Sequence, residues 1–76
     1  MKELLEHIAK SLVDHPDQVS VNEVEGEHSV ILELKVAEED MGKVIGKQGR
    51  IAKAIRTVMK ASAIRDNTRV VVEIIQ

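Results

Sequence analysis

Two glycines separated by two polar residues, Gly46-Lys47-Gln48-Gly49, stand between two segments with helical apolar spacing. Glycine allows backbone conformations closed to other residues, and it allows close approach because no Cβ is in the way. The amphipathic pattern resumes directly after Gly49, so a helix should open there with its first N–H groups pointing at the turn. Such N–H groups favour an anion. The segment therefore predicts a tight helix–turn–helix connection suited to a phosphate backbone.

Apolar residues recur at helical spacing in three segments. The first covers residues 4–13 and ends near Asp14, because Pro16 disfavours helix at the residue before it. The second is short, opens on the acidic residues 38–40, which suit the positive end of a helix dipole, and stops at Gly46. The third follows the glycine turn, and its predicted apolar face consists of Ile51, Ala54, Ile55, Val58, Met59 and Ser62.

Alternating apolar and polar residues predict three strands. The first begins at residues 19–21, a turn follows at Gly26, the second covers 30–36, and a β-branched run over 68–75 forms the third. A strand that returns through two helices has a crossover long enough to lie parallel to its predecessor. We therefore expect one α+β domain over residues 1–76, with order α-β-β-α-α-β and three helices on one face of a three-stranded mixed sheet.

The basic residues are concentrated in one stretch of the chain. Residues 41–60 contain six of them and no acid, so the remainder carries −8 within a total of −2. Local field rather than net charge attracts a polyanion, so binding should be confined to one face. The chain has no Phe, Tyr or Trp, which excludes a platform of aromatic rings for single-stranded bases. Base contacts must then be aliphatic, polar or made by an Arg plane.

Other classes of site fit the sequence poorly. A nucleotide-binding P-loop needs four residues between its glycines and then Lys-Ser or Lys-Thr, whereas Gly42 and Gly46 enclose three and Gln48 follows Lys47. The three histidines lack paired ligand spacing and the chain has no cysteine, so we expect no metal. Acidic pairs occur, but so small a domain has little room for a pocket. We expect no catalytic residue and no cofactor.

The run Ile45-Gly46-Lys47-Gln48-Gly49 resembles the I-G-x-x-G loop of the KH family of RNA-binding domains. Val44, Ile51 and Ile55 stand where that family has apolar positions. The element order is similar to the type II KH fold, and the whole chain resembles the small stand-alone bacterial KH proteins of the KhpA/YlqC family. The resemblance implies a loop that clamps about four nucleotides of single-stranded RNA against an aliphatic groove. It also implies a homodimer, or pairing with a larger KH-containing protein of the Jag/KhpB family.

The predicted RNA-binding residues surround the loop. Gly46 and Gly49 permit close approach, Lys47 and Gln48 contact phosphate and sugar, and Arg50 adds positive field. The predicted apolar groove is lined by Val44 and Ile45, with Ile31 or Leu34 beside them. Lys43 and Lys53 are predicted to be peripheral cations. We expect such a protein to act as a post-transcriptional regulator or RNA chaperone.

Two questions stay open at the level of sequence. A dimerisation module with incidental nucleic-acid affinity is the alternative function, because Ile31, Val71 and Ile75 should share the outward face of the sheet. Only the family likeness favours RNA over single-stranded DNA. The chain lacks a signal pattern and an uncharged run long enough to span a membrane, so we expect a cytoplasmic protein.

Overall fold

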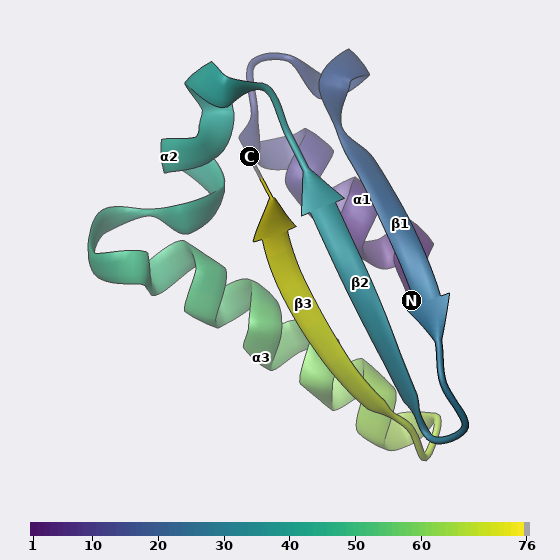
Figure 1. Ribbon diagram of the computed structural model, residues 1–76. Coiled ribbons are helices and arrows are strands. Elements are labelled where there is room, and N and C mark those ends of the chain that lie inside the picture. Colours follow the sequence, from purple (N-terminus) through teal and green to yellow (C-terminus); the bar gives the residue numbers. More distant parts are fainter. Residues whose placement is uncertain (76) are drawn as a thin grey trace.

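The computed structural model describes residues 1–75. Its elements follow the expected order α-β-β-α-α-β, with a short 3-10 turn before β1, before α2 and before α3 (Figure 1). The helices and strands are α1 (Lys2–Leu12), β1 (Ser20–Glu25), β2 (Ser29–Lys35), α2 (Met41–Ile45), α3 (Arg50–Arg65) and β3 (Arg69–Ile75).

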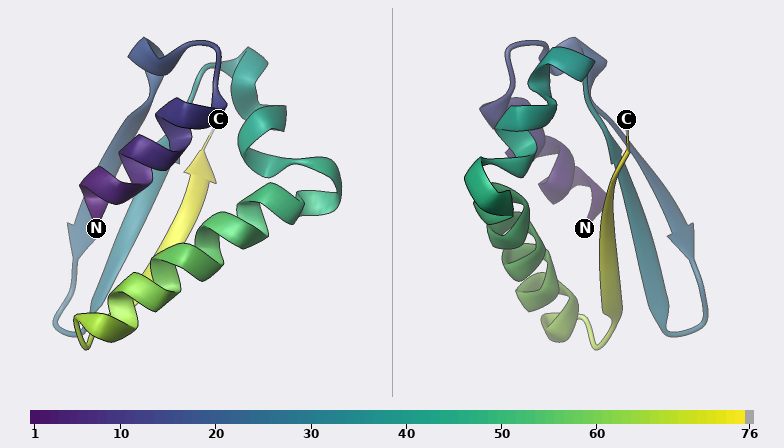
Figure 2. Two further views of the ribbon diagram at one scale, coloured as in Figure 1. Left: turned by 180° about the vertical axis from the view of Figure 1, so that it is seen from behind. Right: turned by 60° about the vertical axis from the view of Figure 1, so that its left-hand side comes forward.

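The three strands form one mixed sheet in the order β1-β2-β3. β1 pairs antiparallel with β2, and β2 pairs parallel with β3. The helices all lie on one face of this sheet (Figure 2). The predicted fold class is therefore confirmed. The order also leaves β3 as an edge strand, and the helical crossover that precedes it runs alongside that open edge.

The strand alternation places one set of side chains against the helices, as the sequence predicts. Val30, Leu32 and Leu34 of β2 are buried, and Val72 of β3 is buried beside them. The core that they form with the helices comprises Leu5, Ala9, Val21, Val30, Leu32, Leu34, Val36, Val44, Ile55, Met59 and Val72. The opposite face of the sheet is open and carries the odd-numbered residues of β2 and β3.

Two predicted helix boundaries are shifted. α1 ends at Leu12 rather than near Asp14, and Val13 is already extended. The acidic residues 38–40 form a 3-10 turn, and the α-helix proper begins at Met41. The end of α1 has a partner in this second segment, because the backbone N–H groups of Asp14 and His15 donate to the carboxylate of Asp40 rather than to carbonyls of α1.

The predicted apolar face of α3 is wrong by a rotation about the helix axis. The residues that α3 buries are Ala52, Ile55, Met59 and Ala63, whereas Ala54 is exposed and Val58 is 47% exposed. Val58 and Ala54 instead line an apolar crevice of about 370 Å³ between α3 and α1, whose remaining lining is Ile8, Leu12, Arg50, Ile51 and Ile55.

Asp40 is the one buried charged residue among residues 1–75, with no exposed surface. Its two oxygens accept N–H bonds from Asp14 at 3.2 Å and His15 at 3.0 Å, and Lys43 Nζ lies 3.8 Å away. Burial raises the pKa of Asp40, but these backbone bonds, with the charges of His15 and Lys43, outweigh burial and lower the pKa below its ordinary value of 3.8. The carboxylate thus ties the loop after α1 to the start of α2.

Asp40→Asn should lower the melting temperature at pH 7 by several degrees, because an amide offers one acceptor oxygen where the carboxylate offers two. A carboxyl with a lowered pKa contributes stability above its unfolded value, and this contribution is lost as pH falls through the folded value. The parent should therefore lose stability on acidification from about pH 5 to pH 2 more steeply than the variant. Thermal denaturation followed by circular dichroism measures both, with exposed Asp17→Asn as the control. Parallel curves for parent and Asp40→Asn would contradict the assigned role.

Candidate nucleic-acid interface

The GKQG loop turns the chain between α2 and α3 through three residues with positive φ. Gly46 has φ 77°, Gly49 has φ 73°, and Gln48 between them has φ 59°. The Gly46 N–H donates to the Gly42 carbonyl at 2.9 Å, and the Gly49 N–H donates to the Gly46 carbonyl at 3.1 Å. A left-handed conformation costs a non-glycine residue roughly 1–2 kcal/mol, and such strain gathers at functional sites. The loop therefore holds Gln48 in a conformation that local preferences disfavour.

The two glycines are needed for different reasons. A Cβ on Gly46 would lie 2.6 Å from Cγ1 of Ile51, so α2 and α3 meet in a contact that admits no side chain there. A Cβ on Gly49 would meet nothing within 4 Å, and only the backbone angle requires glycine. The surface above Gly49 is thus open to close approach by a ligand.

The loop presents polar side chains at the start of a long helix. Lys47, Gln48 and Arg50 are all exposed, and Arg50 Nη2 donates to Gln48 Oε1 at 3.4 Å. α3 begins at Arg50, whose backbone N–H donates to the Lys47 carbonyl, and no side chain caps the helix. Because the helix dipole favours negative charge near its positive end, this end of α3 suits a phosphate.

Val44 and Leu34, two of the predicted groove residues, are not at the surface. Both are fully buried in the core, so neither side chain is placed to contact a base. Ile31 lies on the opposite face of the sheet from the helices, where it pairs with Val71. Ile45 is 37% exposed and is the predicted apolar residue that remains accessible beside the loop.

Lys43 has a structural partner that the sequence did not indicate. Its Nζ lies 3.0 Å from Asp14 Oδ2 and 3.8 Å from Asp40 Oδ1. The hydrogen bond and the charge of Asp14 raise the pKa of Lys43, with a smaller contribution from Asp40. Lys43 therefore links the loop after α1 to α2, and the carboxylates of Asp14 and Asp40 largely compensate its charge.

The remaining cations of the crossover lie along α3. Lys53, Arg56 and Lys60 recur at intervals of three and four residues, so they share one side of the helix, and all three are exposed. Arg56 Nε donates to the carbonyl of Val72 at 3.3 Å, which bridges α3 to β3. The sequence analysis did not include Arg56 in the site. The spacing of the three cations, which puts them on one side of α3, and the position of β3 at the edge of the sheet could have indicated it.

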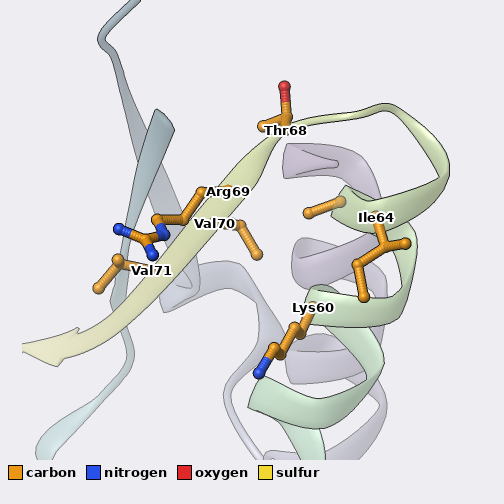
Figure 3. Close-up of a pocket in the computed structure, with 7 residues that line it drawn as sticks. Lys60, Ile64, Thr68, Arg69, Val70 and Val71 are labelled. Carbon is orange, nitrogen blue, oxygen red and sulfur yellow. The ribbon is translucent and has the colours of Figure 1, made fainter. Parts of the chain in front are cut away.

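α3 and β3 diverge from the turn that joins them, and their separation widens toward the glycine loop (Figure 2). A pocket of about 480 Å³ lies near the closed end of this V. Figure 3 shows Ile64 and Val70 facing one another across it, with Lys60 extending from α3. The residues that line the pocket are Lys60, Ala63, Ile64, Thr68, Arg69, Val70 and Val71.

Within residues 1–75 no group of three or more His, Cys, Asp or Glu side chains is placed to hold a metal ion. His15 contacts Glu39, at 3.4 Å from Nε2 to Oε2, while His7 and His28 are exposed. No helix in the described part of the chain is both long and apolar enough to cross a membrane.

A family model and individual protein sequences both match this chain, and they indicate the same family. The family model for the KH domain of KhpA/KhpB matches residues 2–74. RNA-binding protein KhpA of Clostridium acetobutylicum is 79% identical over 99% of this chain and the whole of that protein. The proteins of the same name from Clostridium perfringens and Caldanaerobacter subterraneus are 77% and 67% identical over the same shares.

Solved structures show the same fold in a larger protein. An Era variant from Aquifex aeolicus bound to GDP and aluminium fluoride matches with a TM-score of 0.67 at 21% identity. Era in complex with MgGDPNP and nucleotides of 16S ribosomal RNA matches with a TM-score of 0.60 at 23% identity. Each match covers 96% of this chain and 28% of the Era chain, so the likeness concerns one domain of Era and its fold alone.

Proposed function

This chain belongs to the KhpA/KhpB family of KH domains, and we propose that it is a non-catalytic protein that binds single-stranded RNA through its GKQG loop. The observation that carries the proposal is the loop itself. Lys47 and Gln48 stand exposed on a glycine turn directly before the uncapped N-terminus of α3. The relatives named RNA-binding protein KhpA support RNA as the ligand.

The loop binds the sugar–phosphate backbone of the RNA. The positive end of the α3 dipole faces a phosphate, and Lys47 and Arg50 supply positive charge beside it. Gln48 contacts the sugar, and the bare backbone at Gly49 lets the strand lie close. A loop of this size clamps about four nucleotides. Lys53 is peripheral, and Lys43 adds only field because Asp14 pairs with it.

Bases lie against aliphatic surface because the chain offers no aromatic ring. Ile45 supplies this surface next to the loop, and Arg56 offers a guanidinium plane farther along α3. Such contacts distinguish bases weakly. A clamp that is short and weakly selective suits a cytoplasmic protein that binds many different transcripts, as an RNA chaperone or post-transcriptional regulator does.

Changing Lys47 and Gln48 together to Asp should abolish RNA binding. Two negative charges against phosphate cost several kcal/mol, and a cost of about 3 kcal/mol is already a hundredfold in affinity. Stability should change by no more than about 0.5 kcal/mol, because both side chains are exposed. Fluorescence anisotropy with a labelled single-stranded RNA measures affinity, and thermal denaturation confirms the fold.

The matched control changes Lys10 and Gln18 to Asp, because these exposed residues give the same change in net charge away from the loop. The control should retain most of the affinity. Equal losses in the two double variants would show that net charge, and not the loop, governs binding. An unchanged affinity of the loop variant would refute the site.

We also propose that the domain pairs, with a second copy or with a larger KH-containing protein of the Jag/KhpB family. Two linked clamps gain affinity through effective concentration without new contacts. The open face of the sheet offers a surface, because Val24, Ile31 and Val71 form one row across the three strands. Val24 is 46% and Val71 44% exposed. An apolar row of this kind is typical of an interface.

Val71→Glu should convert a concentration-dependent dimer to monomer, because it buries a carboxylate in the row. Sedimentation velocity over a concentration series measures the change. Val58→Glu is the matched control, since Val58 is 47% exposed on the helical side of the molecule. A dimer disrupted by Val58→Glu alone would place the interface in the crevice between α1 and α3. A parent that stays monomeric at every concentration would refute self-association.

A further inference from the structure

The pocket between the last turns of α3 and the first residues of β3 lies outside the proposed binding site at the GKQG loop. Its volume of about 480 Å³ is within the range of about 300–1,000 Å³ found for sites that hold small organic molecules. It is separate from Gly49, because Lys60 lies eleven residues farther along the chain. At the rise of an α-helix this is roughly 16 Å along the axis of α3.

The lining of the pocket combines an apolar floor with positive charge. Ile64 and Val70 supply aliphatic surface between α3 and β3, while Val71 lies on the outer side of the strand. Ile64 is 69% exposed, the highest value among the exposed large apolar residues of the described chain. Lys60 and Arg69 supply two cations, and Thr68 supplies a hydroxyl. None of the lining residues is acidic. An apolar surface flanked by cations fits a base joined to phosphate, in a protein that has no aromatic ring for stacking.

Figure 3 shows how these groups are arranged. Lys60 extends from α3 on the inner side of β3, while Arg69 lies on the other side of the strand from α3. The two cations therefore stand on either side of the open edge of β3. A nucleic-acid strand that reaches this edge meets one cation on each side, together with backbone groups that have no neighbouring strand.

Exposed cations of α3 lie between the loop and the pocket. Lys53 and Arg56 lie between Gly49 and Lys60 on the same side of the helix. Arg56 reaches β3 midway, at the Val72 carbonyl. A strand clamped at the loop can thus follow the widening V between α3 and β3 to its closed end.

A second copy of the chain fits this pocket less well than a polyanion does. In a symmetric dimer the same patch of both copies meets, so two surfaces that each carry two cations and no acid would be set against one another. Like charges set against one another disfavour association. The absence of an acidic lining residue leaves nothing within the patch to offset them.

We propose that this pocket, defined by Lys60, Ile64, Thr68, Arg69 and Val70, is a second nucleotide-binding site that extends the RNA footprint beyond the four nucleotides held at the loop. The inference rests on the proposed function, because the same strand occupies both sites. The second site takes a base on its aliphatic floor and phosphate on its two cations.

The test compares RNA lengths. Oligouridine of about four and about ten nucleotides is titrated into the full chain and into the double variant Lys60→Gln/Arg69→Gln, because only the longer RNA extends past the loop's footprint of about four. The double variant should bind the longer RNA about tenfold more weakly, and its salt slope should fall by about 1.4, or 0.7 for each lost phosphate contact. Its affinity for the shorter RNA should equal that of the parent.

The control Lys10→Gln/Lys35→Gln removes two exposed cations elsewhere and should leave the length dependence intact. An unchanged affinity of Lys60→Gln/Arg69→Gln for the longer RNA would overturn the inference, as would an equal loss for both lengths. A shift of that variant from dimer to monomer in sedimentation, with RNA affinity unchanged, would assign the pocket to a second copy. Failure of the proposed function looks different, because the parent would then bind neither RNA.

Discussion

The close contact between the backbone of Gly46 and the side chain of Ile51 fixes how α2 and α3 meet. A Cβ at Gly46 would lie 2.6 Å from Ile51 Cγ1, so the approach exists only because glycine occupies this position. Ile51 in turn packs against the core. The direction in which α3 leaves the loop, and hence the face it turns to the sheet, follows from this contact.

The topology then places the binding surface. α2, the loop and α3 form the crossover between the parallel strands β2 and β3, and β3 ends up at the edge of the sheet. Six of the eleven basic residues and no acid lie within residues 41–60, so one connection carries a local excess of positive charge in an acidic protein. Asp40 and Lys43 anchor the start of this connection to the loop after α1. Farther along the connection, Arg56 reaches β3 at the Val72 carbonyl.

The sequence was sufficient where a structure depends on local periodicity. Alternation in β2 and β3 predicted which side chains face the helices, and the glycine spacing predicted the turn before α3. It was insufficient where partners are distant in the chain. Asp40 receives N–H groups from residues 25 and 26 positions earlier, and no local pattern marks such a pair.

The apolar arc of α3 shows the same limit in another form. Its apolar residues cover more of the helix than the sheet can bury, so periodicity alone did not say that Ala52 and Ala63 would face inward and Val58 outward. Val44 was predicted to line the groove because it is apolar and next to the loop, but its side chain is fully buried in the core. The pocket at the closed end of α3 and β3 depends on three-dimensional proximity of Lys60 and Arg69, which sequence spacing does not show.

The central claim is that RNA binds at the glycine loop and along the adjoining side of α3. An NMR titration of the isotope-labelled chain with a single-stranded RNA tests it directly, residue by residue. Binding at the loop should give the largest amide shifts at Gly46, Lys47, Gln48, Gly49 and Arg50, with smaller ones at Lys53 and Arg56. Shifts concentrated on α1 or on the outer face of the sheet, with the loop amides unmoved, would contradict it.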